Sequence, residues 1–369
     1  MRVLIAPQEF KGSLAADEAA LAIASGIRAA HPRWTFDSLP MSDGGPGLID
    51  AMRRALKADT MALVVHDALG RKVLARYVRI RGSGDIIIEA ALANGVLHVK
   101  PNEFNPLGAD SFGVGELILD AAAQEPPRII IGVGGSASND GGEGMARALG
   151  ARFHDMAGNE LPAGGGALGD LAQISWERPR ALDGIEIIVA TDVTNPLCGP
   201  NGAARIYAPQ KGATPAQVDQ LDAAHFRYSQ VLRRHFGRDF ANLPGGGAAG
   251  GLAAGLAAFL GAQIVSGFEV VAEATNLRAR LESADLVVTG EGSFDSQSLQ
   301  GKVTGRVIEM ARDLGKPVTV FAGRTSAEAS DVSVATIESL EPDATEAMAH
   351  AADLLKRLAR EWAEAQPED

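Results

Sequence analysis

The sequence predicts an α/β fold with two domains, and three observations support that prediction. At 369 residues the chain exceeds the usual size of one domain. Apolar strand-like runs that lead through glycine-rich loops into helical patterns occur near both ends of the chain, which is typical of parallel sheets. Residues 61–89 instead show short alternating runs, which indicate antiparallel hairpins. We therefore predict a doubly wound, Rossmann-like parallel-sheet domain from residues 1–66 and 284–369, and an inserted α/β domain with some antiparallel strands at residues 67–283.

The first part of the chain predicts two β-loop-α units. Residues 2–6 are typical of a strand, and Ser13 is a suitable N-cap for a helix that runs to about residue 30. Residues 34–39 predict the next strand, and a helix follows near residues 48–56. The hairpin signals then come from alternating runs that are separated by glycines, at residues 63–66, 73–80 and 85–89.

The middle of the chain combines buried strands with helices. Helical spacing covers residues 107–123, and the apolar residues 129–131 and 185–190 predict buried strands. The clearest helix starts at Thr214, where Pro215 follows and Gln217 completes a capping box, and Gly237 marks its end.

The β-loop-α pattern returns near the C-terminus. Residues 286–289 predict a strand that enters a glycine loop, followed by a helix at about residues 301–314 and a strand at residues 318–321. A last helix over residues 345–365 places its apolar residues near one face, which indicates docking on the body of the protein.

Composition narrows the functional classes. The formal net charge is −12 without a basic run, so we expect no nucleic-acid partner. The longest tract of small apolar residues, 248–262, is too short to span a membrane, so we expect no membrane partner either. The single cysteine, Cys198, cannot form an intramolecular disulfide and is typical of a reducing cytoplasm, where we expect a small packed residue rather than a nucleophile. A homodimer is compatible with the sequence.

The most informative segment is residues 129–144, IIIGVGGSASNDGGEG. Three β-branched residues favour a buried strand, and six glycines in the next thirteen positions favour a loop whose backbone closely approaches a ligand. A strand, a glycine turn and a helix start present backbone N–H groups to an anion such as phosphate. The alternative is that the glycines only let the strand and the helix pack closely.

Four further loops combine glycines or small polar residues with an acid or a lysine, at residues 10–13, 43–45, 191–195 and 290–295. Carboxylates beside hydroxyl and amide groups suit Mg²⁺, which prefers oxygen ligands. Each predicted lysine ligand for a phosphate adjoins a glycine; these are Lys11, Lys211 and Lys302. For any one of these residues the alternative is a solvated turn, but parallel topology brings such loops to one sheet edge.

Known nucleotide-binding motifs match poorly. Neither Lys211 nor Lys302 lies in a Walker A pattern, which disfavours a P-loop kinase. Residues 245–250 match GxGxxG but follow Leu243-Pro244 rather than a strand, so close packing of small residues is the favoured interpretation, ahead of a helix start that faces an anion. The scattered histidines make a zinc site or a Ser/His/Asp triad improbable.

Taken in order, these loops resemble the bacterial type 1 glycerate kinase family. The similar motifs are APQEFKGSL (6–14), PMSDGGPG (40–47), GGSASNDGG (134–142), DVTNPL (192–197), QKG (210–212), GAAGG (247–251), GEGSFD (290–295) and GK (301–302). Three positions depart from the family pattern: Gln8 and Glu9 replace Asp-Ser, and Pro46 replaces Glu. The resemblance implies ATP-dependent, Mg²⁺-assisted phosphorylation of D-glycerate, usually to 2-phosphoglycerate with release of ADP, in a cleft between two α/β domains. The departures leave open a related hydroxy acid as the substrate.

The resemblance and the residue chemistry together suggest roles for the loop residues. Phosphoryl transfer needs alignment, charge neutralisation and a carboxylate near the attacking hydroxyl. We assign catalysis to Lys11, which would stabilise the transferring phosphoryl group, and to Asp192, which would orient or deprotonate the hydroxyl. Asp43 and Asp140 are the expected Mg²⁺ ligands. The expected substrate- or phosphate-binding residues are Ser13, Gly134, Gly135, Ser136, Asn139, Lys211, Glu291, Asp295 and Lys302.

Two other classes stay open at this point. An NAD-dependent dehydrogenase of a small hydroxy acid would use the GxGxxG-like runs, and a non-catalytic sugar-acid binding protein would close a hinged cleft on its ligand. The sequence does not distinguish the 2-hydroxyl from the 3-hydroxyl of glycerate as the acceptor.

Overall fold

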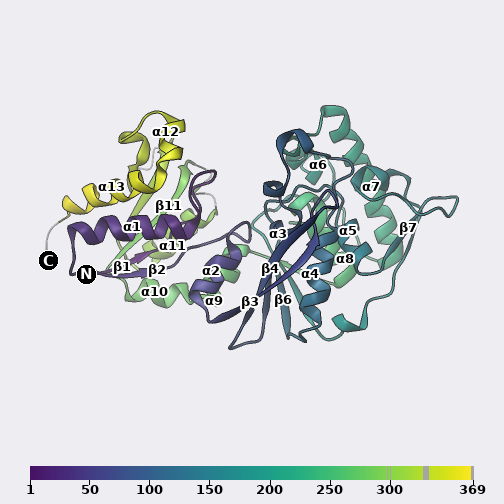
Figure 1. Cartoon of the computed structure of the whole chain (residues 1–369), viewed down its shortest axis with the longest axis horizontal. Helices are drawn as coiled ribbons and strands as arrows, with labels where there is room; N and C mark the ends of the chain where they lie inside the picture. The colour runs from purple at the N-terminus through teal and green to yellow at the C-terminus, as the bar shows by residue number, and fades with distance from the viewer. Residues whose placement is uncertain (297, 300, 327–331, 367–369) are drawn as a thin grey trace. The chain divides into compact units, whose positions relative to one another are not determined.

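The computed structural model describes residues 1–296, 298–299, 301–326 and 332–366 (Figure 1). The chain forms two compact units. Unit 1 comprises Met1–Asp43, Asp50–Leu56 and Phe268–Asp369, and unit 2 comprises Gly44–Ile49 and Lys57–Gly267. Both ends of the chain therefore contribute to unit 1. The boundaries that we predicted at residues 66 and 284 differ from those of the two units.

Unit 1 contains a parallel sheet of five strands. Its strands are β1 (Arg2–Ile5), β2 (Thr35–Ser38), β11 (Leu286–Phe294), β12 (Val318–Thr325) and β13 (Ser333–Thr336), in the order β13-β12-β11-β1-β2. Val3 pairs with Leu286 on one side and with Phe36 on the other. The predicted Rossmann-like parallel sheet, built from both chain ends, is confirmed.

Helices cover this sheet. They are α1 (Ala16–Ala30), α9 (Gly267–Ala274), α10 (Leu277–Ser283), α11 (Val303–Asp313), α12 (Ala344–Ala349) and α13 (Ala351–Glu364), and α2 (Leu48–Ala55) contributes residues to both units. Helices α1 and α13 approach closely, because a Cβ atom on Gly26 would lie 2.2 Å from the carbonyl oxygen of Lys356. The apolar face of the last helix thus docks on the body of unit 1, as expected.

Three details of unit 1 correct the sequence prediction. Ser13 is not an N-cap: its hydroxyl donates to the carbonyl oxygen of Phe10 at 2.9 Å, and Ala15 precedes α1. Strand β11 continues through the predicted glycine loop to Phe294 and pairs with β12 along this segment. Glycine at position 290 permits this close pairing, because a Cβ atom there would lie only 2.1 Å from the carbonyl oxygen of Phe321. The predicted last helix is two helices, with His350 between them.

Unit 2 contains a mixed sheet of six strands. They are β3 (Ala58–His66), β4 (Lys72–Ile80), β5 (Ile86–Glu89), β6 (Arg128–Gly132), β9 (Glu186–Ala190) and β10 (Gln263–Val265), in the order β10-β9-β6-β5-β4-β3. The pairs from β10 to β5 are parallel, and β4 is antiparallel to both β5 and β3. The predicted antiparallel strands are therefore confirmed, although β3 belongs to this sheet and not to the first domain. A separate antiparallel pair joins β7 (Arg152–His154) to β8 (Gln173–Ser175).

The helices of unit 2 are α3 (Ala91–Asn94), α4 (Phe112–Ala122), α5 (Glu143–Ala148), α6 (Ala203–Tyr207), α7 (Pro215–Phe236) and α8 (Leu252–Leu260). Short 3-10 turns complete the chain at η1 (Val96–His98), η2 (Pro101–Glu103), η3 (Gly165–Asp170), η4 (Arg180–Leu182), η5 (Pro209–Lys211), η6 (Ala248–Gly251) and, in unit 1, η7 (Ile337–Ser339). The capping box of α7 is confirmed: Thr214 Oγ1 accepts from the backbone N–H of Gln217 at 3.3 Å, and Gly237 ends the helix with φ +70°.

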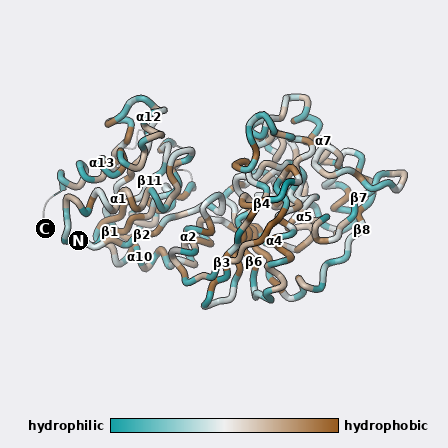
Figure 2. The backbone as a smooth tube through the Cα atoms, viewed as in Figure 1, coloured by the Kyte–Doolittle hydropathy of each residue, from teal (hydrophilic) through white to brown (hydrophobic). Residues whose placement is uncertain are grey.

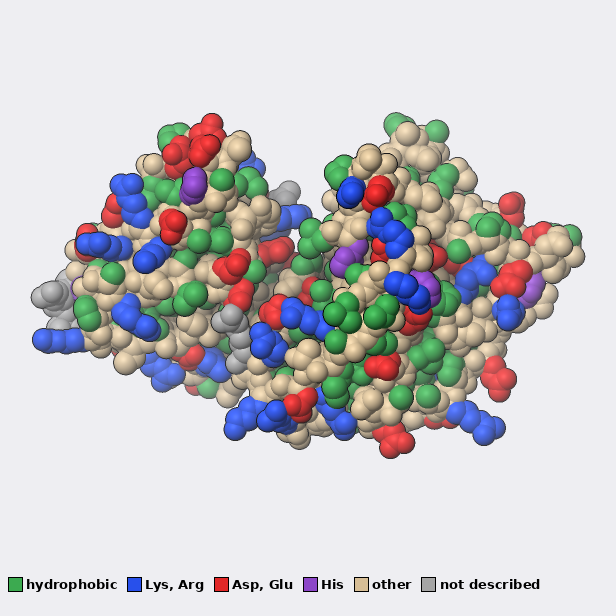
Figure 3. Space-filling view, in the orientation of Figure 1, with side chains coloured by type: hydrophobic (Ala, Val, Ile, Leu, Met, Phe, Trp, Pro, Cys, Tyr) green, Lys and Arg blue, Asp and Glu red, His purple; other side chains and the backbone are tan. Residues whose placement is uncertain are grey.

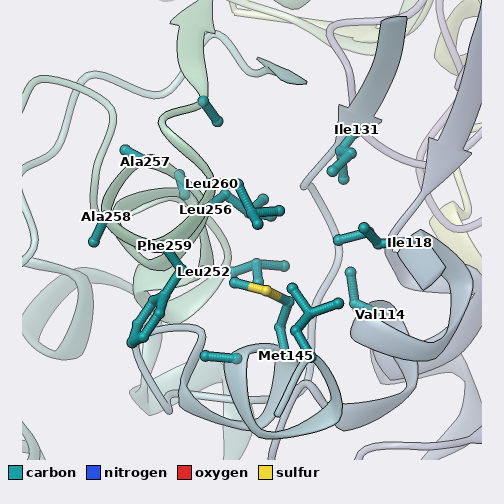
Figure 4. Packing of buried hydrophobic residues seen from close by; sticks show 14 of the residues in the cluster. Val114, Ile118, Ile131, Met145, Leu252, Leu256, Ala257, Ala258, Phe259 and Leu260 are labelled. Carbon is teal, nitrogen blue, oxygen red and sulfur yellow. The ribbon is translucent and has the colours of Figure 1, made fainter. Parts of the chain in front are cut away.

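Helix α8 lies at the centre of the unit 2 core. Leu252 and Leu256 face Met145 of α5 and Ile118 of α4 (Figure 4). Figure 2 shows hydrophobic colouring along β6 and α4, which supply further residues of this core. Figure 3 shows basic and acidic side chains interspersed on the displayed face of the protein. Among the described residues, no helix has the length and apolar character needed to cross a membrane.

The tract of small residues before and within α8 packs on the glycine loop that follows β6, residues 133–142. A Cβ atom on Gly250 would lie 2.1 Å from the carbonyl oxygen of Ser138, and one on Gly255 would lie 2.5 Å from that of Gly141. The favoured interpretation of this tract, close packing, is therefore confirmed. Glycine is required at both positions, because the contacted backbone atoms of the loop cannot move aside as the end of a flexible side chain can.

Replacing Gly255 by alanine should destabilise the protein, because overpacking costs about 1–3 kcal/mol. The higher helix propensity of alanine relative to glycine, about 1 kcal/mol, offsets part of this loss. Denaturant unfolding measures this change. The matched control is Gly169→Ala in η3, where no atom lies within 4 Å of the added Cβ. Equal stability of the two variants would contradict the close contact.

Candidate active site

The carboxyl edge of the unit 2 sheet collects polar groups from neighbouring strands. Ala190 at the end of β9 pairs with Gly132 of β6 and with Val265 of β10. The residues that follow these strands therefore emerge side by side. The glycine loop of residues 133–142 follows β6, Asp192 follows β9, and Ser266 follows β10.

Asp192 is held by a neighbour from the next strand. The hydroxyl of Ser266 donates to Asp192 Oδ1 at 2.6 Å, which is a short, charge-assisted hydrogen bond. Asp192 is half-buried, so its carboxylate is both oriented and accessible from the edge of the sheet. Such a carboxylate can accept a proton from a hydroxyl group that is bound beside it.

The start of the glycine loop presents unused backbone donors. Among the described residues, no hydrogen bond uses the N–H of Gly134, Gly135 or Ser136 as a donor. Gly135 is exposed and has φ +73°, a left-handed conformation that glycine adopts without strain. Successive N–H groups in a tight turn form a binding site for an anion.

Buried hydrogen bonds hold the rest of the loop in place. Asp140 is fully buried, and its Oδ2 accepts from the backbone N–H and the hydroxyl of Ser111 at 2.8 and 2.7 Å, and from the N–H of Gly144 at 2.9 Å. Asn139 is also buried, with its side-chain amide on the carbonyl oxygen of Pro106. Both residues lie below the loop rather than on its outer surface.

Two further acids lie near Asp140: Glu143 is buried and Asp110 is half-buried. Burial raises the pKa of Glu143 to about 8, with Asp140 adding repulsion and the ion pair with Arg147 opposing it. Burial together with Asp140 raises the pKa of Asp110 to about 6. Both acids interact with Asp140, which holds the loop, so we assign them to the support of the loop.

The segment Gly44–Ile49 also packs on this edge. A Cβ atom on Gly44 would lie 2.4 Å from the carbonyl oxygen of Ala190, and one on Gly135 would lie 2.9 Å from the ring of Pro46. The carboxylate of Glu89 accepts from the N–H of Gly47 at 3.1 Å. The proline that departs from the family pattern therefore places an apolar ring beside the unused N–H donors.

Unit 1 brings a second polar group together after β1 and β2. The side-chain amide of Gln8 donates to Asp43 Oδ2 at 3.4 Å. Burial raises the pKa of Glu9, and the charge of Asp43 raises it further, whereas Lys11 lowers it. The structure thus places Glu9, Asp43 and Lys11 near one another, and the side chain of Lys11 is exposed.

A third group surrounds the carboxyl end of β11. Glu291 is buried, which raises its pKa, while nearby Ser298, Thr304 and Lys302 lower it. Asp295 is engaged locally, because its Oδ1 accepts from the backbone N–H of Ser298 at 3.1 Å. Lys302 is exposed and directly precedes α11.

Two other predictions concern cysteine and metal chemistry. Cys198 is buried, and burial raises the pKa of its thiol to about 11, which keeps it protonated as expected for a packed residue. Among the described residues, no group of three or more His, Cys, Asp or Glu side chains could hold a metal ion. A metal cage built by the protein alone is therefore absent from that part of the chain.

Comparison with known proteins decides the family. The model of the glycerate kinase family matches residues 3–366. The chain belongs to the glycerate kinase family. It is 44% identical over 326 residues to the glycerate 2-kinase of Escherichia coli strain K12, covering 88% of this chain and 85% of that protein. It is 39% identical to the glycerate kinase of Bacillus subtilis strain 168, covering 98% and 97%.

Comparison with a solved structure supports the same family. The crystal structure of a candidate glycerate kinase 2 from Salmonella typhimurium LT2 matches with a TM-score of 0.81 and 41% identity, over 98% of this chain and 97% of that one. Membership in the glycerate kinase family makes the protein a kinase, and the resemblance read from its motifs is confirmed. It also favours phosphoryl transfer over the dehydrogenase and the non-catalytic binding protein.

The structure adds residues that sequence reasoning missed. Ser266 follows a strand of only three residues, β10, which is too short to show a periodic pattern. Ser111, Asn94 and His225 support the glycine loop from distant parts of the chain. The glycine loop was the sequence signal for these residues, because its buried backbone and side-chain polar groups need hydrogen-bond partners from elsewhere in the chain.

Proposed function

We propose that the protein transfers a phosphoryl group from ATP to a hydroxyl of D-glycerate, giving 2-phosphoglycerate and ADP. Family membership supports the kinase reaction, and the names of the relatives support glycerate as the acceptor. The observation that carries the proposal is the juxtaposition of Asp192, held by Ser266, with the unused N–H groups that follow the neighbouring strand β6.

Asp192 acts on the acceptor in this proposal. Its carboxylate orients the attacking hydroxyl and accepts the proton as the new O–P bond forms. The N–H groups of Gly134, Gly135 and Ser136 bind an anionic group, either a phosphate or the carboxylate of glycerate, through charge-assisted hydrogen bonds. Alignment and charge neutralisation provide most of the catalysis in phosphoryl transfer.

Unit 1 contributes the charges that meet the nucleotide. The exposed ammonium of Lys11 stabilises the transferring phosphoryl group, and Lys302 binds nucleotide phosphate. Glu9 and Asp43 suit Mg²⁺, because this ion is usually held by one or two carboxylates together with phosphate oxygens and waters. When bound, Mg²⁺ neutralises negative charge on the phosphates. Asp140, with its oxygens engaged by Ser111 and Gly144, is better suited to anchoring the loop than to holding the ion.

Cytoplasmic location and the use of ATP with Mg²⁺ complete the proposal. Its direct test is incubation with ATP, Mg²⁺ and D-glycerate, followed by ³¹P and ¹³C NMR of the product. Phosphorus coupling to the C2 proton supports 2-phosphoglycerate, coupling to the C3 protons indicates the 3-phosphate, and no product at all contradicts the proposal. Related hydroxy acids serve as competing acceptors, because Gln8, Glu9 and Pro46 depart from the family pattern.

Replacing Ser266 by alanine should lower kcat by about 10- to 100-fold, since a hydrogen bond to a charged group contributes roughly 1.5–3 kcal/mol and each factor of ten in rate is about 1.4 kcal/mol. The KM values should change little, because Ser266 positions Asp192 and does not bind the substrate. Ser266→Thr keeps the hydroxyl and is expected to restore most of the rate. Steady-state kinetics measure all three enzymes, and a wild-type kcat for Ser266→Ala would contradict the positioning role.

A further inference from the structure

Lys211 is a buried lysine whose ammonium group faces the glycine loop. It ends η5 and is 2% exposed. Its Nζ donates to Ser136 Oγ at 3.0 Å and to the carbonyl oxygen of Ser138 at 2.5 Å. Removing an ammonium group from water is costly unless the protein replaces the lost hydration. Here the replacement comes from two residues of the loop.

The charges around Lys211 do not include an ion-pair partner. Within the described residues, no carboxylate lies within salt-bridge distance of its Nζ. Asp140 supplies the main attractive charge, and it opposes the lowering of the lysine pKa to about 7 that burial causes. The imidazole of His225 is also nearby, and burial lowers its pKa, which favours the neutral form. Lys211 therefore directs its hydrogen bonds at the loop and not at an acid.

The segment that Lys211 contacts is also held from the other side. The side-chain amide of Asn94 donates to Ser138 Oγ at 3.1 Å, and the carbonyl oxygen of Asn94 accepts from the N–H of Ala137 at 2.7 Å. Ser136, the partner of Lys211, is the last of the three residues with unused N–H groups. A shift of Ser136 would thus move the donors that face the anion.

We propose that Lys211 is a positioning residue that fixes Ser136 and Ser138 from beneath, so that the N–H groups of Gly134, Gly135 and Ser136 stay aligned toward an anionic group of the substrates. This inference rests on the proposed function and deepens it. It replaces the expectation that Lys211 binds phosphate itself, because the buried ammonium group differs from the exposed ones of Lys11 and Lys302. When Lys211 is protonated, its positive charge adds to the attraction for an anion without direct contact.

The test compares Lys211→Met, Ser136→Ala and the double variant with wild type. Hydrogen exchange of a peptide covering residues 134–142 reports the loop directly. We expect Lys211→Met to raise its exchange rate about 10-fold and to lower kcat/KM about 10- to 100-fold, because small displacements of positioned groups are costly. The KM that rises, for ATP or for D-glycerate, identifies the anion bound by the loop. Lys100→Met, an exposed lysine of unit 2, is the matched control.

A role through Ser136 predicts coupling. Once Lys211 is methionine, Ser136→Ala should add much less than its effect in the wild type. Additive effects, or wild-type exchange and kcat/KM in Lys211→Met, overturn the inference. Should Lys211→Met fail to fold, Ser136→Ala alone still decides, because wild-type exchange of the loop in that variant contradicts the bracing contact.

The two proposals fail separately. If the wild-type protein does not phosphorylate D-glycerate with ATP, the proposed function is wrong, yet the exchange measurement still tests the support of the loop by Lys211. If the wild type is an active kinase and the variants show normal exchange with reduced turnover, the loop is not braced by Lys211 and only this inference falls.

Discussion

Replacing Asp192 by asparagine is expected to lower kcat by about 10²- to 10⁴-fold, the usual contribution of a positioned acid–base group. Asparagine has nearly the same shape, and its Oδ1 can still accept the hydrogen bond that Ser266 donates at 2.6 Å in the native protein. The fold and the binding of both substrates should therefore persist. Only the ability to take the hydroxyl proton is removed. A coupled assay of ADP release measures kcat, and calorimetry measures the binding of each substrate.

The matched control is an acid near the opposite end of β9 (Glu186–Ala190). Asp183 is an exposed acid shortly before β9, on the amino side of the sheet, so Asp183→Asn should leave kcat within about 2-fold. An Asp192→Asn variant that is folded, binds both substrates and turns over normally would remove Asp192 from the reaction.

The second large effect is expected for Lys11. Replacing it by methionine should lower kcat by about 10²- to 10³-fold, comparable to the loss of one donor to a developing negative charge. The side chain is exposed, so the loss of stability should be small. Because the neighbouring Glu9 and Asp43 would then lack a compensating cation, the apparent affinity for Mg²⁺ should rise or stay unchanged rather than fall.

Rapid-quench measurement of a single turnover separates the chemical step of Lys11→Met from product release. Lys356→Met on α13 is the control, since that lysine is exposed and belongs to the same unit. If Lys11→Met raised the KM for ATP and left kcat unchanged, Lys11 would bind the ground state and would not stabilise the transition state.

The fold was predictable where local signals were strong. Apolar runs before glycines identified the parallel strands, and the capping box identified the start of α7. The end of β11 was not predictable, because a glycine-rich segment is typical of a loop until a neighbouring strand such as β12 supplies partners for its backbone. The predicted domain boundaries differ from the boundaries of the two units for the same reason. Only tertiary pairing shows that β3 belongs with β4.

The candidate site was also predictable only where local sequence signals were strong. Sequence motifs located Asp192 and the glycine loop, because these lie directly after buried strands. They could not distinguish residues above the loop from residues below it. Asp140, Asn139 and Lys211 share the composition of ligand-binding residues, yet tertiary packing buries all three. That Lys11 and Asp192 act on one substrate stays a prediction, as do the roles of Glu291 and Asp295.

The contact between Gly255 and the backbone of the glycine loop has a consequence for how this enzyme can change. A helix of the apolar core and a loop that we assign to substrate binding share one surface without intervening side chains. Substitution of larger residues in α8 would therefore disturb the loop as well as destabilise the core. Selection for activity would then restrain the sequence of a helix that is buried throughout its length.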